Sequence, residues 1–120
     1  MSQKILLVEA EKELRYRYQN ELEAMGYEVV AVTSGRGALQ KLKHEPVELI
    51  VLDLQLPDGS GLEYLQQFMD VNRDVKVVIN TWSPLYKWDF RSWAANAYLI
   101  ISSDSSELKN TIDGVLQSNE

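Results

Sequence analysis

Residues 49–61 read LIVLDLQLPDGSG, and this stretch decides the fold of the chain. Four apolar residues in a row, Leu49 to Leu52, predict a strand that is covered on both faces, as in a parallel sheet. Asp53 follows directly, and Pro57-Asp58-Gly59 is typical of a turn because proline fixes φ and glycine permits unusual backbone angles. The stretch therefore predicts a buried strand that delivers one carboxylate to a loop open to solvent.

Similar apolar runs recur along the chain, and segments with helical periodicity separate them. The predicted strands are Ile5–Val8, Val29–Val32, Leu49–Leu52, Val75–Ile79 and Tyr98–Ile101. Apolar residues three and four positions apart predict helices over Glu11–Met25, Gly35–Lys43, Gly61–Met69, Pro84–Ala94 and Asp104–Leu116. Strands that alternate with helices in this way predict an α/β sandwich with a five-stranded parallel sheet and five helices.

The composition excludes several classes of protein. The 120 residues suit one domain, which we expect to span residues 1–120. Twelve basic residues against 18 acidic ones give a net charge of −6, which argues against direct binding of nucleic acid. The chain has no cysteine, so disulfide scaffolds and thiolate metal sites are excluded. No apolar stretch reaches the roughly 18 residues of a membrane span, and the N-terminus does not read as a signal peptide. We therefore expect a cytoplasmic protein that does not insert into membranes.

The chemistry of such a sheet is expected beyond the carboxyl ends of its strands, where ligands bind in open parallel sheets. Glu9, Asp53 and Thr81 follow the first, third and fourth predicted strands. No glycine-rich phosphate cradle follows the first strand, and no nucleophile–base pair is visible. A flavodoxin-like enzyme or nucleotide binder therefore has little support, and we expect a protein that is not an enzyme.

Several of these segments together resemble the receiver domains of bacterial response regulators. They are Ile5–Glu9, Met25–Val29, Val51–Gly61, Thr81 and Ala97–Leu99. The resemblance covers essentially the whole chain in the right order. It implies a flavodoxin-like three-layer sandwich with strand order 2-1-3-4-5. It also implies a function in a two-component or phosphorelay pathway, in which a histidine kinase or phosphotransfer protein phosphorylates one aspartate.

The resemblance assigns roles to individual residues near the strand ends. Asp53 matches the phosphoryl acceptor, and Thr81 matches the hydroxyl that binds a phosphoryl oxygen. Mg²⁺ would be held by Glu9, by Asp53 and by the backbone carbonyl of Gln55. Hard oxygen ligands of this kind suit Mg²⁺, and phosphoryl transfer depends on positioning and on neutralising charge.

Two positions depart from the family pattern. Ala10 stands where the second acidic metal ligand is expected, and Ile101 stands where the lysine is expected. Removing one preorganised charge-stabilising group typically costs about 10²–10³ in rate. The resemblance therefore predicts impaired phosphorylation and weak or absent Mg²⁺ binding. The alternative is a phosphorylation-independent pseudo-receiver that acts as a protein-interaction module.

An aromatic segment lies between the last two predicted strands. It contains Trp82, Tyr86, Trp88, Phe90 and Trp93. Trp82 would roof the phosphoryl pocket, and Trp88 lies on the helix 4–strand 5–helix 5 face through which receivers contact an output domain or a second copy. Tyr98 aligns with the family's switch aromatic. The alternative is that some of the side chains of this segment pack into the core and that Tyr98 is an ordinary core tyrosine, since large aromatics suit both cores and interfaces.

Overall fold

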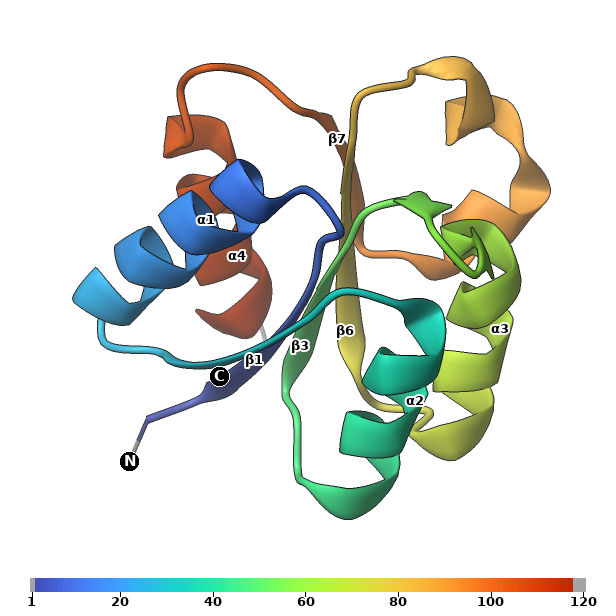
Figure 1. Cartoon of the computed structure of the whole chain (residues 1–120), viewed down its shortest axis with the longest axis horizontal. Helices are drawn as coiled ribbons and strands as arrows, with labels where there is room; N and C mark the ends of the chain where they lie inside the picture. The colour runs from blue at the N-terminus through green and yellow to red at the C-terminus, as the bar shows by residue number, and fades with distance from the viewer. Residues whose placement is uncertain (1, 118–120) are drawn as a thin grey trace.

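Five parallel strands form the centre of the protein in the order β2-β1-β3-β6-β7, which confirms the predicted sheet (Figure 1). The computed structural model describes residues 2–117. The strands are β1 (Lys4–Val8), β2 (Glu28–Val32), β3 (Leu49–Leu52), β6 (Lys76–Thr81) and β7 (Ala97–Ile100). β6 is shifted along the chain from the predicted 75–79, so Thr81 is the last residue of the strand. The central β3 pairs with β1 on one side and with β6 on the other.

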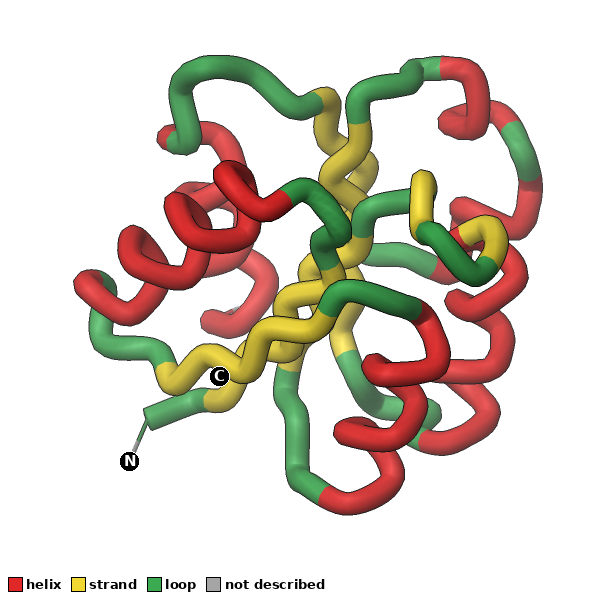
Figure 2. The backbone as a smooth tube through the Cα atoms, in the orientation of Figure 1, coloured by secondary structure: helices red, strands yellow, loops and turns green. Residues whose placement is uncertain are grey.

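Two layers of helices cover the sheet (Figure 2). α1 (Lys12–Ala24) and α4 (Ser106–Gln117) lie on one face, and α2 (Gly35–His44) and α3 (Gly61–Val71) lie on the other (Figure 1). Each layer has its own apolar core, because successive side chains of a strand point to opposite faces. Leu7 and Val51, for example, face the α1–α4 layer, whereas Leu6 and Ile50 face α2 and α3.

The prediction of a helix over Pro84–Ala94 is wrong. Two short 3₁₀ helices, η1 (Leu85–Trp88) and η2 (Phe90–Ala94), take its place. Asp89 has extended backbone angles between them, and its carboxylate accepts the N–H of Arg91 at 2.9 Å. Ser92 is the only buried residue of the two turns. The segment therefore buries no apolar stripe against the sheet, and such burial is the main source of helix stability in proteins.

The loop after β3 folds as a small hairpin, which confirms the turn predicted at residues 57–59. β4 (Gln55–Leu56) pairs with β5 (Gly59–Ser60), and Gly59 adopts a φ of 144° that few other residues tolerate. The carboxylate of Asp58 accepts the backbone N–H groups of Gly35 and Arg36, each at 3.0 Å. These bonds fasten the hairpin to the first turn of α2, so the loop that follows Asp53 has a fixed position.

Candidate functional site

The ends of β1, β3 and β6 bring three of the predicted site residues together. The hydroxyl of Thr81 donates a hydrogen bond of 3.1 Å to Oδ1 of Asp53. The backbone N–H of Gln55 donates to the same oxygen, also at 3.1 Å. Glu9, at the end of β1, lies close enough to Asp53 for the Asp53 carboxyl group to raise the pKa of Glu9. The predicted grouping of these side chains is therefore present.

The prediction that Asp53 faces open solvent is wrong. Asp53 is only 4% exposed, Glu9 is 2% exposed and Thr81 is fully buried. The residue that follows Thr81, Trp82, donates its indole N–H to the carboxylate of Glu11 at 3.3 Å. The site is a covered pair of acidic groups rather than an open hollow.

The electrostatics of the site are dominated by negative charge. Burial, followed by the charge of neighbouring Asp53, raises the pKa of Glu9 to about 8. One hydrogen bond opposes this shift, because Oε2 of Glu9 accepts the backbone N–H of Glu11 at 3.1 Å. Within residues 2–117, neither Glu9 nor Asp53 forms an ion pair with a basic side chain. Arg15 donates instead to the carbonyl oxygens of Glu9 and Ala10, both at 3.1 Å.

This donor set fits Mg²⁺. Mg²⁺ usually binds proteins through one or two carboxylates and keeps several waters, and its binding here would displace the proton that the raised pKa leaves on Glu9 at neutral pH. Glu9, Asp53 and the carbonyl of Gln55 could therefore hold the ion. Ala10 is exposed and offers no side-chain ligand. In the described part of the chain, no three side chains of the Asp, Glu, His and Cys types are grouped closely enough to form a metal site by themselves.

Ile101, at the position where the family pattern has a lysine, belongs to the apolar core. Ile101 is 5% exposed and belongs to the apolar cluster between the sheet and the α1–α4 layer. Its backbone N–H donates to the carbonyl of Thr81 at 2.9 Å, which continues the pairing of β7 with β6. The side chain therefore supplies packing where the family pattern would supply a positive charge.

The residues predicted for switching and output occupy different environments. Tyr98 is partly buried against the α2–α3 core, and its hydroxyl donates to the carbonyl of Ser83 at 2.6 Å. Burial raises the pKa of Tyr98. Trp82 is 50% exposed and Trp88 is 81% exposed. Tyr98 is thus tied to the loop after Thr81, whereas both tryptophans reach the surface.

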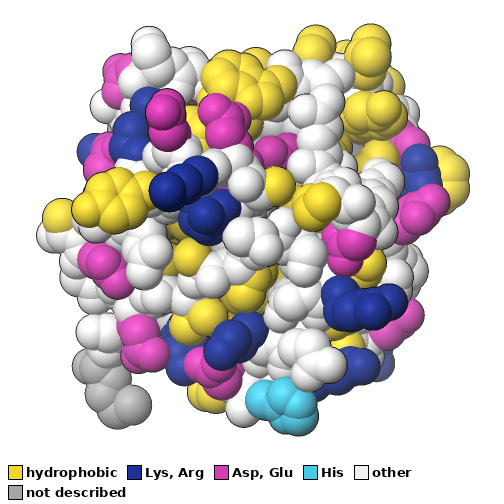
Figure 3. All heavy atoms as spheres, viewed as in Figure 1, with side chains coloured by type: hydrophobic (Ala, Val, Ile, Leu, Met, Phe, Trp, Pro, Cys, Tyr) yellow, Lys and Arg dark blue, Asp and Glu magenta, His cyan; other side chains and the backbone are white. Residues whose placement is uncertain are grey.

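Apolar side chains gather over the corner formed by η1 and η2 (Figure 3). The exposed large side chains of this aromatic surface are Leu85, Tyr86, Trp88, Phe90 and Trp93. The alternative that these aromatics belong to the core is therefore wrong for Trp88, Phe90 and Trp93, which are at least 70% exposed. Contiguous exposed apolar groups of this size are typical of interaction surfaces.

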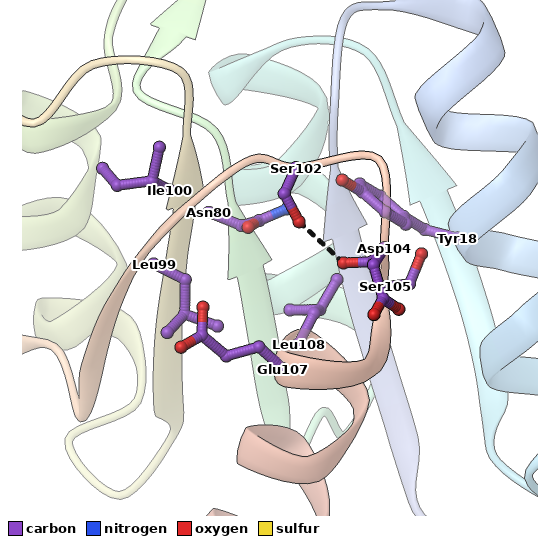
Figure 4. A pocket seen from close by; sticks show the side chains of 9 residues that line it. All are labelled: Tyr18, Asn80, Leu99, Ile100, Ser102, Asp104, Ser105, Glu107 and Leu108. Carbon is purple, nitrogen blue, oxygen red and sulfur yellow. Dashed lines mark hydrogen bonds between the residues drawn. The ribbon is translucent and has the colours of Figure 1, made fainter.

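A small hollow lies between β6, β7, α1 and the start of α4 (Figure 4). It measures about 10 Å³, and Tyr18, Asn80, Leu99 and residues at the start of α4 line it. Asp53 and Thr81 do not line it, so it is not the acceptor site. Asn80 is 3% exposed, and its Nδ2 has no hydrogen-bond partner among residues 2–117. The sequence analysis missed this residue, although an asparagine between the apolar run Val77–Ile79 and Thr81 is an unusual feature.

Comparison with known proteins identifies the family. The sequence matches the family described as the response regulator receiver domain over residues 5–113. The chain therefore belongs to this family, whose members act in two-component signalling.

Several curated relatives are response regulators. The chain is 32% identical over 115 residues to the response regulator ArlR of Staphylococcus saprophyticus, covering 95% of this chain and 52% of ArlR. It is 30% identical over 78 residues to the receiver protein CpdR of Brucella abortus, covering 65% of each. A match to the regulatory protein PhoP of Bacillus subtilis has 40% identity over 67 residues, which is 56% of this chain and 28% of PhoP. The chain thus spans less than two thirds of the length of each of these relatives.

Solved structures agree with this assignment. The response regulator TrrA of Thermotoga maritima, in complex with Mg²⁺-BeF, superposes with a TM-score of 0.90 at 32% identity, covering 94% of this chain and 98% of TrrA. TrrA in complex with the histidine kinase ThkA gives a TM-score of 0.87 at 33% identity, covering 96% of this chain and 98% of TrrA.

Over residues 2–117 of the present structure, every helix is too short or too polar to cross a membrane.

Proposed function

We propose that this receiver domain accepts a phosphoryl group on Asp53 and that the reaction is slow for the family. The observation that carries the proposal is the hydrogen bond from Thr81 to Asp53 beside the buried carboxyl of Glu9. A histidine kinase or phosphotransfer protein would be the donor. The complex of the related TrrA with the histidine kinase ThkA supports a kinase as the partner.

In this proposal each residue of the site has a separate task. A carboxylate oxygen of Asp53 bonds to phosphorus while the bond from phosphorus to the donor breaks, and the leaving group keeps the electron pair. The Thr81 hydroxyl, now bonded to Asp53, would turn to a phosphoryl oxygen. Glu9, Asp53 and the Gln55 carbonyl would hold Mg²⁺, which would neutralise charge on the phosphoryl oxygens.

The slow rate follows from the two departures in the site. Ala10 provides no metal ligand, and Ile101 points its side chain into the core instead of placing a cation near Asp53. Each missing group would lower the rate by about 10²–10³ if it acted independently. Residues that act as a unit are seldom additive, so the combined loss is smaller than the product.

The output surface in this proposal is the face formed by η1, η2, β7 and α4. The aromatic surface lies there, and Tyr98 connects it to the acceptor site through the carbonyl of Ser83. Exposed aromatic side chains are common anchors of protein interfaces. The partner would be an output domain or a second copy of the receiver, and the protein would act in the cytoplasm.

Intact-mass measurement tests the acceptor role. The protein is incubated with Mg²⁺ and acetyl phosphate, and the expected result is a slow mass increase of one phosphoryl group. Asp53→Asn should abolish the increase, whereas Asp58→Asn, a substitution in the same loop, should retain it. No mass increase in the wild-type protein over long incubation, or an increase that survives Asp53→Asn, would overturn the proposal.

A pseudo-receiver is the second candidate, and the absence of a charged group at both Ala10 and Ile101 favours it. In that case the domain binds its partner through the aromatic surface without phosphorylation. Asp53→Asn would then leave partner binding unchanged, and titration with Mg²⁺ would change tryptophan fluorescence little. Trp88→Ala would weaken partner binding in either case, so it does not distinguish the two functions.

A further inference from the structure

Trp82 and Glu11 make a hydrogen bond across the end of the central strand. The indole N–H of Trp82 donates to Oε2 of Glu11 at 3.3 Å, although 71 residues separate the two in the sequence. Trp82 follows the last residue of β6, and Glu11 lies in the loop after β1. These two strands are the neighbours of β3 on its two sides. The bond therefore spans the position at which β3 ends, which is where Asp53 lies.

The dimensions of the sheet place this link directly over the acidic pair. Neighbouring strands lie about 4.8 Å apart, so β1 and β6 are separated by about 10 Å across β3. A tryptophan side chain and a glutamate side chain that meet over this gap leave little free space between them. Both ends of the link are anchored at the site: Thr81 bonds to Asp53, and the N–H of Glu11 bonds to Glu9. Asp53 is 4% exposed, as expected for a group that lies beneath such a link.

We propose that Trp82 and Glu11 form a strap that controls access to Asp53 and discriminates against bulky reagents. The strap opens when the Trp82–Glu11 bond breaks and the half-exposed indole swings outward. Small reagents reach Asp53 through brief openings, whereas larger groups need the indole to leave. The consequence for phosphodonor choice rests on the proposed function of Asp53, but the strap itself does not.

A single cysteine at the acceptor position tests the strap without phosphorylation. The chain contains no cysteine, so Asp53→Cys introduces a unique thiol. Its alkylation is timed with iodoacetamide, which is small, and with pyrene maleimide, which is bulky; both reagents are neutral. In this background, Trp82→Ala should raise the rate with the bulky reagent by about tenfold or more, because labelling of a covered group follows the open fraction. The rate with iodoacetamide should rise less.

Further variants separate the bulk of the indole from its hydrogen bond. Trp82→Phe keeps an aromatic ring without the N–H, and Glu11→Ala keeps the indole without its acceptor, so both should give intermediate rates. Trp88→Ala is the matched control, since Trp88 is 81% exposed and lies in η1. Equal rates with and without the Trp82→Ala substitution, or an equal rise in the Trp88→Ala variant, would overturn the strap.

Phosphorylation of the proteins that retain Asp53 then separates the two proposals. With acetyl phosphate, Trp82→Ala should acquire the phosphoryl group faster than the wild type. If Trp82→Ala changes the alkylation rate of the introduced cysteine but no protein is phosphorylated, the strap stands and the proposed acceptor function fails. If the wild type is phosphorylated but Trp82→Ala changes neither the rate of phosphorylation nor the alkylation rate of the introduced cysteine, the acceptor function stands and the strap fails.

Discussion

The hydroxyl of Thr81 donates a hydrogen bond to Oδ1 of Asp53 at 3.1 Å, and both residues are almost completely buried. This bond joins the ends of β3 and β6 on the face where Glu9 also lies. The same oxygen accepts the N–H of Gln55. The orientation of the Asp53 carboxylate is therefore set by one side-chain donor and one backbone donor.

Replacing Thr81 by valine should destabilise the protein. Valine has nearly the shape of threonine and suits a strand, so the main change is the loss of one donor to a buried carboxyl group. We expect the free energy of unfolding to fall by about 1–2 kcal/mol. Urea denaturation followed by circular dichroism measures the change. Thr33→Val, at the exposed end of β2, is the control, and an equal effect of both substitutions would contradict a stabilising Thr81–Asp53 bond.

The stability of the protein should decrease as the pH rises from 4.5 to 8. In the folded protein the pKa of Glu9 is about 8, against 4.5 for an ordinary glutamate. Between these values the native state binds one proton more than the unfolded chain does. The contribution of Glu9 is therefore complete below pH 4.5 and is lost as the pH approaches 8, with a slope of at most about 1.4 kcal/mol per pH unit.

Denaturation at several pH values tests the role of Glu9, with Mg²⁺ removed by a chelator. Glu9→Gln should flatten the pH dependence because glutamine does not titrate. Glu63→Gln, at an exposed position on α3, should leave the slope of the wild type. A wild-type protein that becomes more stable from pH 5 to pH 8 would show that Glu9 ionises normally.

Replacing Asn80 by leucine should stabilise the protein. The Nδ2 group of Asn80 is buried without a hydrogen-bond partner in the part of the chain that the structure describes, and an unsatisfied buried donor costs about 1–3 kcal/mol. Leucine has a similar shape and no polar group. Tyr18, Leu99 and Leu108 offer it apolar contacts, although Ser102, Asp104, Ser105 and Glu107 also line the hollow. We expect the free energy of unfolding to rise by about 1 kcal/mol. Thermal and urea denaturation measure it.

The matched control for this prediction is the same substitution at a paired asparagine. Oδ1 of Asn96 accepts the N–H of Val77 at 2.9 Å, so Asn96→Leu removes a hydrogen bond that exists. It should destabilise the protein. If Asn80→Leu also destabilises it to a similar extent, then Asn80 is paired in solution and the prediction is wrong.

The sheet could be predicted from the sequence because its signal is local. Each strand is a nearly continuous apolar run, and a parallel sheet between two helical layers is the arrangement that buries such runs on both faces. The positions of Asp53, Thr81 and Glu9 follow from the same rule, because each comes at or just beyond the carboxyl end of an apolar run. The turn at Pro57–Gly59 was equally local.

The features that the sequence did not reveal depend on contacts between distant segments. The apolar residues of 84–94 have helical spacing, but none of those in η1 and η2 is buried, and Asp89 interrupts the segment with extended backbone angles. Asp53 is buried although it follows the end of its strand, and the Trp82–Glu11 contact, which joins residues 71 positions apart, is encoded by no local pattern. Ile101 could be identified as a departure from the family, but its place in the α1–α4 core required the structure.

Replacing Ala10 by aspartate should strengthen Mg²⁺ binding. Ala10 is exposed and lies directly after Glu9, so a carboxylate fits there without displacing core atoms. A further acidic ligand raises affinity for a hard cation, and we expect an increase of about tenfold or more. Binding must also displace the proton of Glu9, whose pKa is about 8, so affinity should rise between pH 6 and pH 8 in both proteins.

Isothermal titration with MgCl₂ measures this gain. Ala24→Asp adds the same charge at an exposed position at the end of α1 and should leave the affinity unchanged, so it separates a new ligand from a general electrostatic effect. Ile101→Lys is a poor alternative route to a more active site, because it places an ammonium group where Ile101 is 5% exposed and should lower stability. Equal Mg²⁺ affinities for the wild type and Ala10→Asp would mean that the end of β1 does not face the metal, and the assignment of Glu9 as a ligand would then be wrong.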